Sequence, residues 1–108
     1  MNDTFKSTRD VILQTRDWEA ALKFYGETLG LPMADRFNDI VGFEAGGFRL
    51  YLEKGELAGP VHEFLVADVQ GAKRRLIEAG CVVVEEDPSV PRCYLRDPFG
   101  LVFNLGRG

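Results

Sequence analysis

Long apolar runs are missing from this sequence, in which no uninterrupted apolar stretch exceeds four residues. A helix that spans a bilayer needs about 20 predominantly apolar residues, so the sequence predicts no membrane partner. Residues 1–9 also lack the apolar core of a secretory signal. We therefore expect a cytoplasmic location.

An excess of basic residues is missing as well. The chain carries 13 Lys and Arg against 17 Asp and Glu, which gives a formal net charge of −4. Nucleic-acid binding needs a basic stripe or patch, and the densest basic cluster is only Lys73, Arg74 and Arg75. The sequence therefore predicts that nucleic acid is not a partner.

Cysteine and histidine are scarce, with two and one residues respectively. Cys81 and Cys93 stand in a sequence without a secretory signal, so we expect two buried thiols rather than a disulfide or a metal pair. Nothing in the sequence places a Ser or Cys nucleophile beside His62. No nucleophile with an adjacent base is predicted.

A repeated pattern fills the 108 residues, which is the length of one domain. Apolar residues recur at helical spacing after Asp17 until Gly30, and again after Asp68 until Gly80. An aspartate carboxylate at the N-cap accepts a backbone N–H of the first turn, and glycine allows the left-handed conformation that ends a helix. We therefore expect Asp17 to cap a continuous helix that begins at Trp18.

The two helices belong to a duplicated unit. Asp17 and Asp68, Ala21 and Ala72, and Glu27 and Glu78 are each 51 residues apart. Strands are expected at residues 9–15, 33–37, 40–45 and 48–53, and in the second copy at residues 64–67, 82–86, 91–96 and 101–105. The sequence thus predicts a single α+β domain at residues 1–108, with two tandem β-α-β-β-β modules at about residues 9–54 and 61–106 and a linker at about residues 55–60.

Alternation along the strands assigns their residues to two faces. The face expected under the helices is apolar and consists of Val11, Leu13, Thr15, Phe48, Leu50, Leu52, Phe64, Val66, Leu101, Phe103 and Leu105. The opposite face mixes apolar and charged residues and consists of Asp10, Ile12, Gln14, Arg49, Tyr51, Glu53, Val61, Glu63, Leu65, Val102 and Asn104. A mixed face is typical of a ligand cavity. We therefore expect a curved mixed sheet that lines a small-molecule cavity, with the helices on its outer face.

Several motifs resemble the vicinal oxygen chelate superfamily. They are an Asp-x-x-x-Ala sequence at the first helix, Phe24 and Tyr25 within it, Leu29, Gly30 and Leu31 at its end, and the segment 96–100, Arg-Asp-Pro-Phe-Gly, before the last strand. The superfamily includes glyoxalase I, extradiol dioxygenases, fosfomycin resistance enzymes and bleomycin resistance proteins. The resemblance runs from about Arg9 to Leu105 and so covers nearly the whole chain.

The resemblance implies a position for a divalent metal ion, which enzymes of the superfamily hold with His or Gln on the first strand of each module and Glu on the last. The residues at these positions here are Asp10, Tyr51, Val61 and Asn104. Only the aspartate is a usual ligand for such an ion, and valine has no donor atom. The sequence therefore predicts neither a bound metal nor another cofactor. The alternative is a local bulge that brings His62, Glu53 or Glu63 to the ion.

Two functions remain open from the sequence. The favoured one is a binding protein that resembles the bleomycin resistance branch and has no catalytic residue. Tyr51 and Tyr94 would then stack on an aromatic or cationic ligand, and Asp10, Glu53 and Glu63 would face its positive groups. The alternative is a metal-dependent enzyme, either a glyoxalase-like lyase or isomerase or an extradiol-type dioxygenase. Open strand edges and the resemblance also predict a homodimer.

Overall fold

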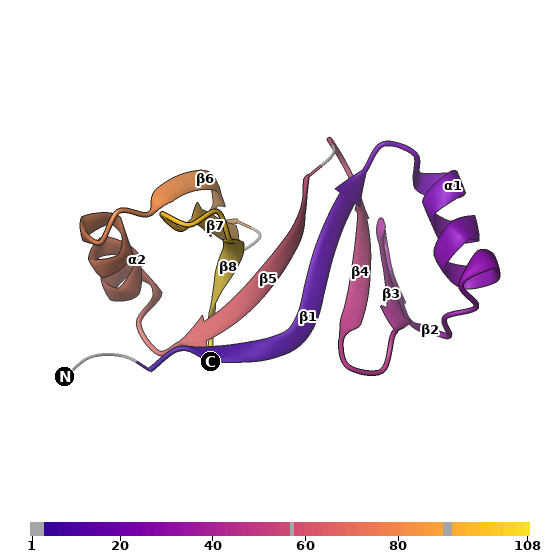
Figure 1. The fold of residues 1–108 in the computed structure, drawn as a ribbon, viewed down its shortest axis with the longest axis horizontal. Helices are drawn as coiled ribbons and strands as arrows, with labels where there is room; N and C mark the ends of the chain where they lie inside the picture. Colours follow the sequence, from indigo (N-terminus) through magenta and orange to yellow (C-terminus); the bar gives the residue numbers. More distant parts are fainter. Residues whose placement is uncertain (1–3, 57, 90–91) are drawn as a thin grey trace. The chain divides into compact units, whose positions relative to one another are not determined.

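The computed structural model describes residues 4–56, 58–89 and 92–108. The chain divides into two compact units, which are Arg9–Pro60 (the first unit) and Val61–Gly108 together with Met1–Thr8 (the second unit). Each unit contains a helix and a four-stranded sheet, and the chain enters each helix from a strand and leaves it for three more strands (Figure 1). The predicted α+β class with two β-α-β-β-β repeats is confirmed.

The sheet of the first unit mixes parallel and antiparallel strands. Its elements are β1 (Lys6–Thr15, whose first three residues belong to the second unit), α1 (Trp18–Lys23), β2 (Met33–Phe37), β3 (Ile40–Glu44) and β4 (Arg49–Lys54). The strands lie in the order β2-β3-β4-β1, with β1 parallel to β4 and the other pairs antiparallel. The crossover from β1 through α1 lets β1 and β4 run in the same direction.

The second unit repeats this connectivity. Its elements are β5 (Ala58–Val66, whose first three residues belong to the first unit), α2 (Val69–Glu78), β6 (Val82–Asp87), β7 (Arg92–Arg96) and β8 (Val102–Arg107). The strands lie in the order β5-β8-β7-β6, and β5 and β8 form the parallel pair. Strand β5 begins inside the segment 55–60 that the sequence predicts as a linker.

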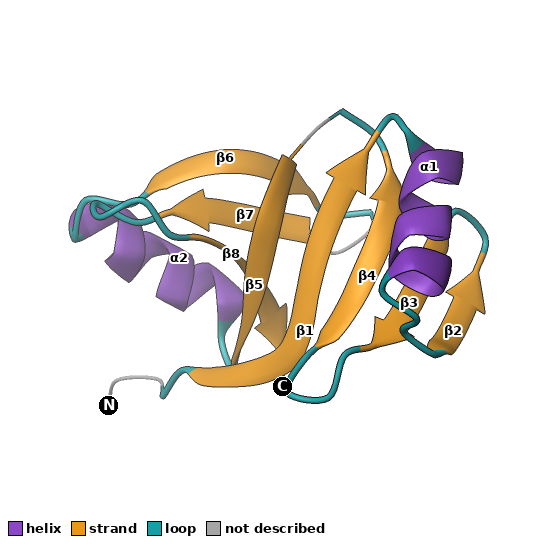
Figure 2. Cartoon of the chain, turned by 45° about the vertical axis from the view of Figure 1, so that its right-hand side comes forward, coloured by secondary structure: helices purple, strands orange, loops and turns teal. Residues whose placement is uncertain are grey.

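Each helix buries its apolar side on its own sheet (Figure 2). In the first unit Trp18 packs among Val41, Phe43, Leu50 and Leu52, with partly buried Val11 and Leu13 around them. In the second unit Ala72 packs among Val66, Cys81, Cys93, Leu95, Phe103 and Leu105. Several strand residues that alternation places on the helix side are members of these two clusters. For those residues the prediction is confirmed. Both cysteines are free and buried, as predicted.

The first helix differs from its prediction in two ways. The α-helical part ends at Lys23, and Phe24–Thr28 continue as a π-helix in which the Leu29 N–H bonds to the Phe24 carbonyl at 2.9 Å. Apolar spacing does not distinguish this wider turn from an α-helix. The Asp17 carboxylate also makes no cap hydrogen bond, which contradicts the prediction. The backbone N–H of Asp17 instead donates a hydrogen bond to the Thr15 hydroxyl at 3.1 Å.

Two residues expected under the helices lie elsewhere. Phe48 is 42% exposed and Leu101 is 39% exposed, because β4 and β8 each begin one residue later than predicted. Gly30 does end the first helical segment with φ of 69°, as predicted for a left-handed residue.

No helix in the described part of the chain is long and apolar enough to cross a membrane.

Candidate functional site

The first unit brings its six predicted ligand residues together in three rows. The parallel pairing of β1 with β4 places Asp10 opposite Arg49, Ile12 opposite Tyr51, and Gln14 opposite Glu53. Because side chains alternate along a strand, these rows share the face of the sheet that α1 does not cover. We call this surface the Tyr51 face.

The Tyr51 hydroxyl is held by two charged partners. It donates to the Asp35 carboxylate at 3.1 Å and accepts from the Arg49 guanidinium at 3.3 Å. Burial raises the pKa of the Tyr51 phenol, and its hydrogen bond to Asp35 raises it further, while the hydrogen bond from Arg49 lowers it. The phenol is therefore neutral at physiological pH and donates a hydrogen bond to the Asp35 carboxylate.

Arg49 connects this hydroxyl to a second group of charges. Its guanidinium lies 3.4 Å from an Asp35 oxygen and 3.6 Å from a Glu44 oxygen, and Glu44 also pairs with Arg9. The hydrogen bond to Tyr51 and the nearby carboxylates raise the pKa of Arg49. The backbone N–H of Gly46 and the Arg9 guanidinium hold the pKa of Glu44 below its usual value. Both shifts favour the charged forms of Arg49 and Glu44.

A buried amide orients Glu53 at the far end of the same face. Gln14 is 8% exposed, and its Nε2 donates to a Glu53 oxygen at 2.5 Å. A buried amide is normally hydrogen-bonded, and here the carboxylate of the opposite strand is its partner. The Tyr51 face therefore carries one ring, one arginine and carboxylates whose positions are set by other side chains.

The second unit contains a related row. Tyr94, Asn104 and Glu63 lie opposite one another on β7, β8 and β5. The Asn104 Nδ2 donates to Glu63 at 3.0 Å, and its Oδ1 accepts the backbone N–H of Cys93 at 2.9 Å. Each unit thus contains a glutamate that a buried amide on the neighbouring strand holds in place.

The other predicted residues of the second unit differ in exposure. Val61 is 2% exposed and Tyr94 is 3% exposed, whereas Leu65 and Val102 are partly exposed. The Arg92 guanidinium lies 5.0 Å from the centroid of the Tyr94 ring, so a cation already stacks on that ring. Tyr51 is consequently the better placed of the two tyrosines to meet a ligand. That either tyrosine contacts a ligand stays a prediction.

The donors at the superfamily's metal positions do not fit a divalent ion. In the first unit the positions hold Asp10 and the neutral Tyr51 phenol, and in the second unit they hold Val61, without a donor, and Asn104, whose oxygen already accepts a backbone N–H. A metal ligand must offer an available lone pair, and the groups that usually do so are anionic side chains and imidazoles. His62 is exposed on β5, and the described residues contain no group of three His, Cys, Asp or Glu side chains that would hold an ion.

Sequence reasoning missed Asp35 and Gly42. The register places Asp35 opposite Gly42 on β3, and Gly42 opposite Tyr51 on β4. A Cβ at position 42 would lie 2.8 Å from a Tyr51 ring atom, so the absence of a side chain lets the ring lie across β3 and reach Asp35. A glycine inside a predicted strand was the available signal, because it marks a close approach.

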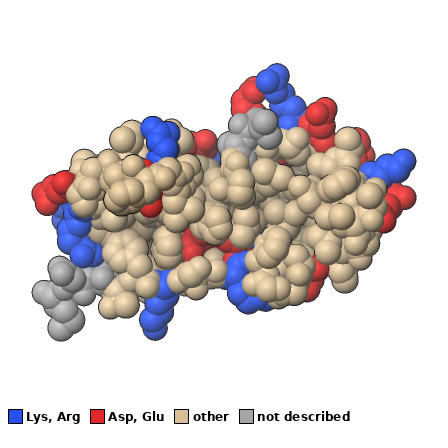
Figure 3. Space-filling model, viewed as in Figure 1, with Lys and Arg blue, Asp and Glu red and all other residues tan. Residues whose placement is uncertain are grey.

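The charges of the surface are mixed in sign. On the side shown in Figure 3, Lys and Arg form small separate groups among Asp and Glu, with no continuous basic area. That nucleic acid is not a partner stays a prediction.

A comparison with protein families identifies one family. The family model of a glyoxalase-like domain matches residues 10–106. No curated protein has a sequence of significant similarity.

Solved structures share the fold at low sequence identity. A hypothetical protein from Bacillus halodurans C-125 superposes with a TM-score of 0.63 at 14% identity, over 97% of this chain and 95% of the other. A glyoxalase/bleomycin resistance protein/dioxygenase superfamily member from Vibrio splendidus 12B01 has a TM-score of 0.61 at 17% identity, over 97% and 100% of the two chains. These identities establish likeness of fold alone.

A dioxygenase also contains this fold. Homoprotocatechuate 2,3-dioxygenase from Brevibacterium fuscum, in complex with 3,4-dihydroxyphenylacetate, has a TM-score of 0.65 at 20% identity. The match covers 97% of this chain and 37% of the dioxygenase.

Proposed function

The chain belongs to the glyoxalase-like domain family within the vicinal oxygen chelate superfamily, and we propose that it binds a small organic molecule without a metal ion, in the manner of the bleomycin resistance branch. The ligand contacts the Tyr51 face. The protein acts in the cytoplasm as a homodimer and sequesters its ligand rather than converting it.

One observation carries this proposal: at the superfamily's metal positions Tyr51 and Asn104 are engaged with other side chains and Val61 has no donor, while charged side chains order the face around Tyr51. Tyr51 is fixed by Asp35 and Arg49, and Asn104 is fixed by Glu63 and the Cys93 backbone. Side chains preorganised in this way favour binding of a complementary ligand, because little rotamer entropy is lost on association.

The charge of the face favours a cationic aromatic ligand. Asp10, Asp35, Glu44 and Glu53 contribute four carboxylates in the first unit, against the guanidiniums of Arg9 and Arg49. A planar cation would meet both the negative potential of these carboxylates and the π-face of Tyr51. A planar anion would be repelled by the same carboxylates.

The test uses proflavine, a planar aromatic cation, as the probe. Fluorescence titration should show saturable binding that is unchanged by EDTA, and elemental analysis of protein purified without chelator should find less than stoichiometric metal. Replacing the ring by Tyr51→Leu should weaken proflavine binding about tenfold, since an aromatic contact contributes about 0.5–1.5 kcal/mol beyond its buried area. The matched control is Phe99→Leu, because Phe99 is 94% exposed on a turn of the second unit.

Two results would overturn the proposal. Stoichiometric bound metal together with loss of binding in EDTA would move the protein to the metal-dependent enzymes. Equal binding by proflavine and by anthracene carboxylate, with no effect of Tyr51→Leu, would remove the Tyr51 face as the ligand surface.

A further inference from the structure

The guanidinium of Arg49 lies at the hydroxyl end of the Tyr51 ring. Its Nη1 donates to the Tyr51 hydroxyl at 3.3 Å and to the Asp35 carboxylate at 3.4 Å. Hydrogen bonds from a guanidinium to a carboxylate are normally about 2.7–2.9 Å long, so the contact with Asp35 is loose. Arg49 is therefore placed beside the ring by contacts that it can exchange at little cost.

The other edge of this guanidinium has no acceptor in the described part of the chain. The Nε of Arg49 is buried and forms no hydrogen bond with a described residue, and a Glu44 oxygen faces it at 3.6 Å, too far for a hydrogen bond. Because this nitrogen is closed to solvent, bulk water does not serve as its acceptor. Buried donors in proteins are normally hydrogen-bonded, so this edge is suited to an acceptor that the chain does not supply.

Glu44 stays paired when Arg49 turns away from it. Its carboxylate forms an ion pair with Arg9 and accepts the Gly46 N–H at 3.1 Å. The side chain of Arg49 is itself 33% exposed, so a turn of its guanidinium presents the Nε edge at the surface. Such a turn therefore leaves no carboxylate without a partner.

The charges around Arg49 favour a neutral acceptor. The guanidiniums of Arg9 and Arg49 balance the carboxylates of Asp35 and Glu44, with which they form ion pairs. A carbonyl oxygen preserves this balance, whereas a carboxylate adds a third negative charge to the group. A carbonyl is consequently the better partner for the open edge of the guanidinium.

We propose that Arg49 selects ligands that carry a carbonyl oxygen at the edge of an aromatic ring. The ligand ring contacts Tyr51, and the carbonyl oxygen accepts from the Nε–H and Nη2–H of Arg49, which lie along one edge of the planar guanidinium. This inference rests on the proposed function and narrows the ligand class to planar aromatic cations with a ketone or amide group. Arg49 is thus the specificity-determining residue of the Tyr51 face.

Two planar cations that differ in one substituent test this selection. The probes are 9-aminoacridine-2-carboxamide and 9-amino-2-methylacridine, which carry a carboxamide and a methyl group at the same ring position. Fluorescence titration should show about tenfold tighter binding of the carboxamide, since its oxygen gains a hydrogen bond from a charged donor. The corresponding carboxylate should bind more weakly than the carboxamide.

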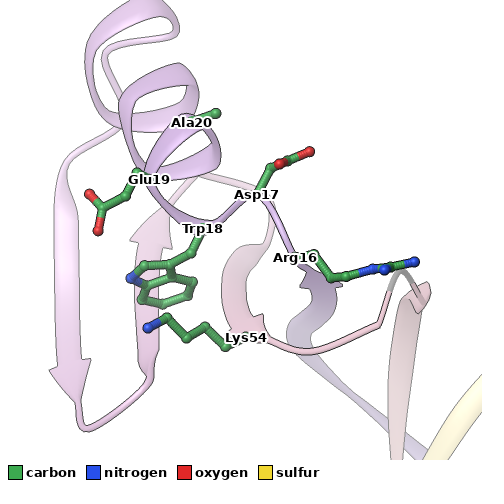
Figure 4. A pocket seen from close by; sticks show the side chains of 6 residues that line it. All are labelled: Arg16, Asp17, Trp18, Glu19, Ala20 and Lys54. Carbon is green, nitrogen blue, oxygen red and sulfur yellow. The ribbon is translucent and has the colours of Figure 1, made fainter.

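Variants of β4 assign the preference to Arg49. Arg49→Met should bind the two probes equally, and Arg49→Lys should lose most of the preference, because lysine keeps the charge but not the planar edge. Lys54→Met is the matched control, since it removes a positive charge from the same strand and should leave the preference unchanged. Lys54 lies 6.0 Å from the centroid of the Trp18 ring, in a pocket at the start of α1 that is lined by neither Arg49 nor Tyr51 (Figure 4).

Proflavine separates this inference from the proposed function. If the unmodified protein binds proflavine and Tyr51→Leu weakens that binding, equal affinity for the carboxamide and the methyl probe overturns the selection by Arg49 and leaves the proposed function standing. Full preference in Arg49→Met, or tighter binding of the carboxylate than of the carboxamide, overturns it in the same way. Absence of proflavine binding overturns the proposed function and this inference together.

Discussion

Gly42 shows how one side chain of the Tyr51 face depends on the absence of another. A Cβ at this position would lie 2.8, 3.2 and 3.3 Å from three atoms of the Tyr51 ring. The ring cannot keep its place over β3 beside a methyl group, and moving it breaks the hydrogen bond to Asp35. The glycine therefore positions the aromatic ring.

We expect Gly42→Ala to reduce the free energy of unfolding by about 1–3 kcal/mol, the usual cost of overpacking a tight contact. Urea unfolding measures this change. Gly47→Ala is the control, because a Cβ there has no atom within 4 Å, and its effect should stay within about 0.5 kcal/mol. Equal losses in both variants would show that the Tyr51 ring is not held against β3.

The ionisation of Tyr51 predicts a pH effect on stability. Burial raises its pKa above the ordinary value of 10.0, so the folded protein binds the phenolic proton more tightly than the unfolded chain does. The resulting stability is fully present below about pH 10 and is lost as pH rises through the folded pKa. The free energy of unfolding of Tyr51→Phe, measured with urea, should accordingly fall less steeply above pH 10 than that of the unmodified protein. Parallel pH curves for the two proteins would contradict the assignment.

Two adjacent residues of β4, Leu50 and Tyr51, lie on opposite faces of the sheet in the first unit. Leu50 is 7% exposed in the helix-side core, whereas Tyr51 is partly exposed on the opposite face. Leu50→Ala should cost about 2–5 kcal/mol of unfolding free energy and leave proflavine binding intact in the folded fraction. Tyr51→Ala should weaken proflavine binding with a clearly smaller loss of stability. The reverse pattern would mean that the ligand lies on the helix side.

At the scale of elements, the two helix starts look alike in sequence and differ in structure. Asp68 caps α2 by accepting the Gly71 N–H at 3.0 Å, whereas the Asp17 carboxylate makes no cap bond to α1. The backbone explains the difference, because Asp68 is extended at φ −122° and ψ 94°, while Asp17 has φ −88° and ψ 60°. Only the extended conformation directs the carboxylate at the first turn.

The two aspartates form a matched pair of substitutions. We expect Asp68→Ala to lower the free energy of unfolding by about 0.5–2 kcal/mol, the typical value of an N-cap. Asp17→Ala should change it by less than about 0.5 kcal/mol. Both values come from urea unfolding monitored by circular dichroism, and a cost for Asp17→Ala as large as that for Asp68→Ala would show that the carboxylate caps α1 in solution.

At the scale of the whole molecule, the outer strand of each sheet exposes apolar side chains. On β2 Met33 is 53% and Phe37 is 70% exposed, and on β6 Val82 is 52% and Val84 is 48% exposed. Open edges with apolar side chains favour pairing with another chain. These strands are the candidates for the contact in the homodimer that we propose.

Sedimentation velocity at micromolar concentration should therefore give twice the mass of the chain. Replacing Phe37 by lysine places a charge on the β2 edge and should shift the equilibrium toward monomer, with Lys23→Met as a control that leaves it unchanged. A monomer at all concentrations tested would contradict the dimer.

Much of the fold follows from local pattern. The 51-residue offset, the helix stop at Gly30 and the alternation of Leu50 and Leu52 with Arg49 and Tyr51 are all confirmed, because each depends only on periodicity and backbone preference. The π-helix at Phe24–Thr28 was not predictable in this way, since apolar spacing tolerates one extra residue per turn.

The sequence by itself determined the residues that each face of a strand carries, because side-chain direction alternates with a period of two wherever a strand forms. Only the tertiary structure decided which of those residues touch. Asp35 reaches Tyr51 because β2 and β4 flank a strand with glycine at the crossing point, and Lys54 reaches Trp18 because the parallel crossover returns β4 beside the start of α1. Such contacts join residues 16 and 36 positions apart, and strand register, which no local pattern encodes, sets their distance.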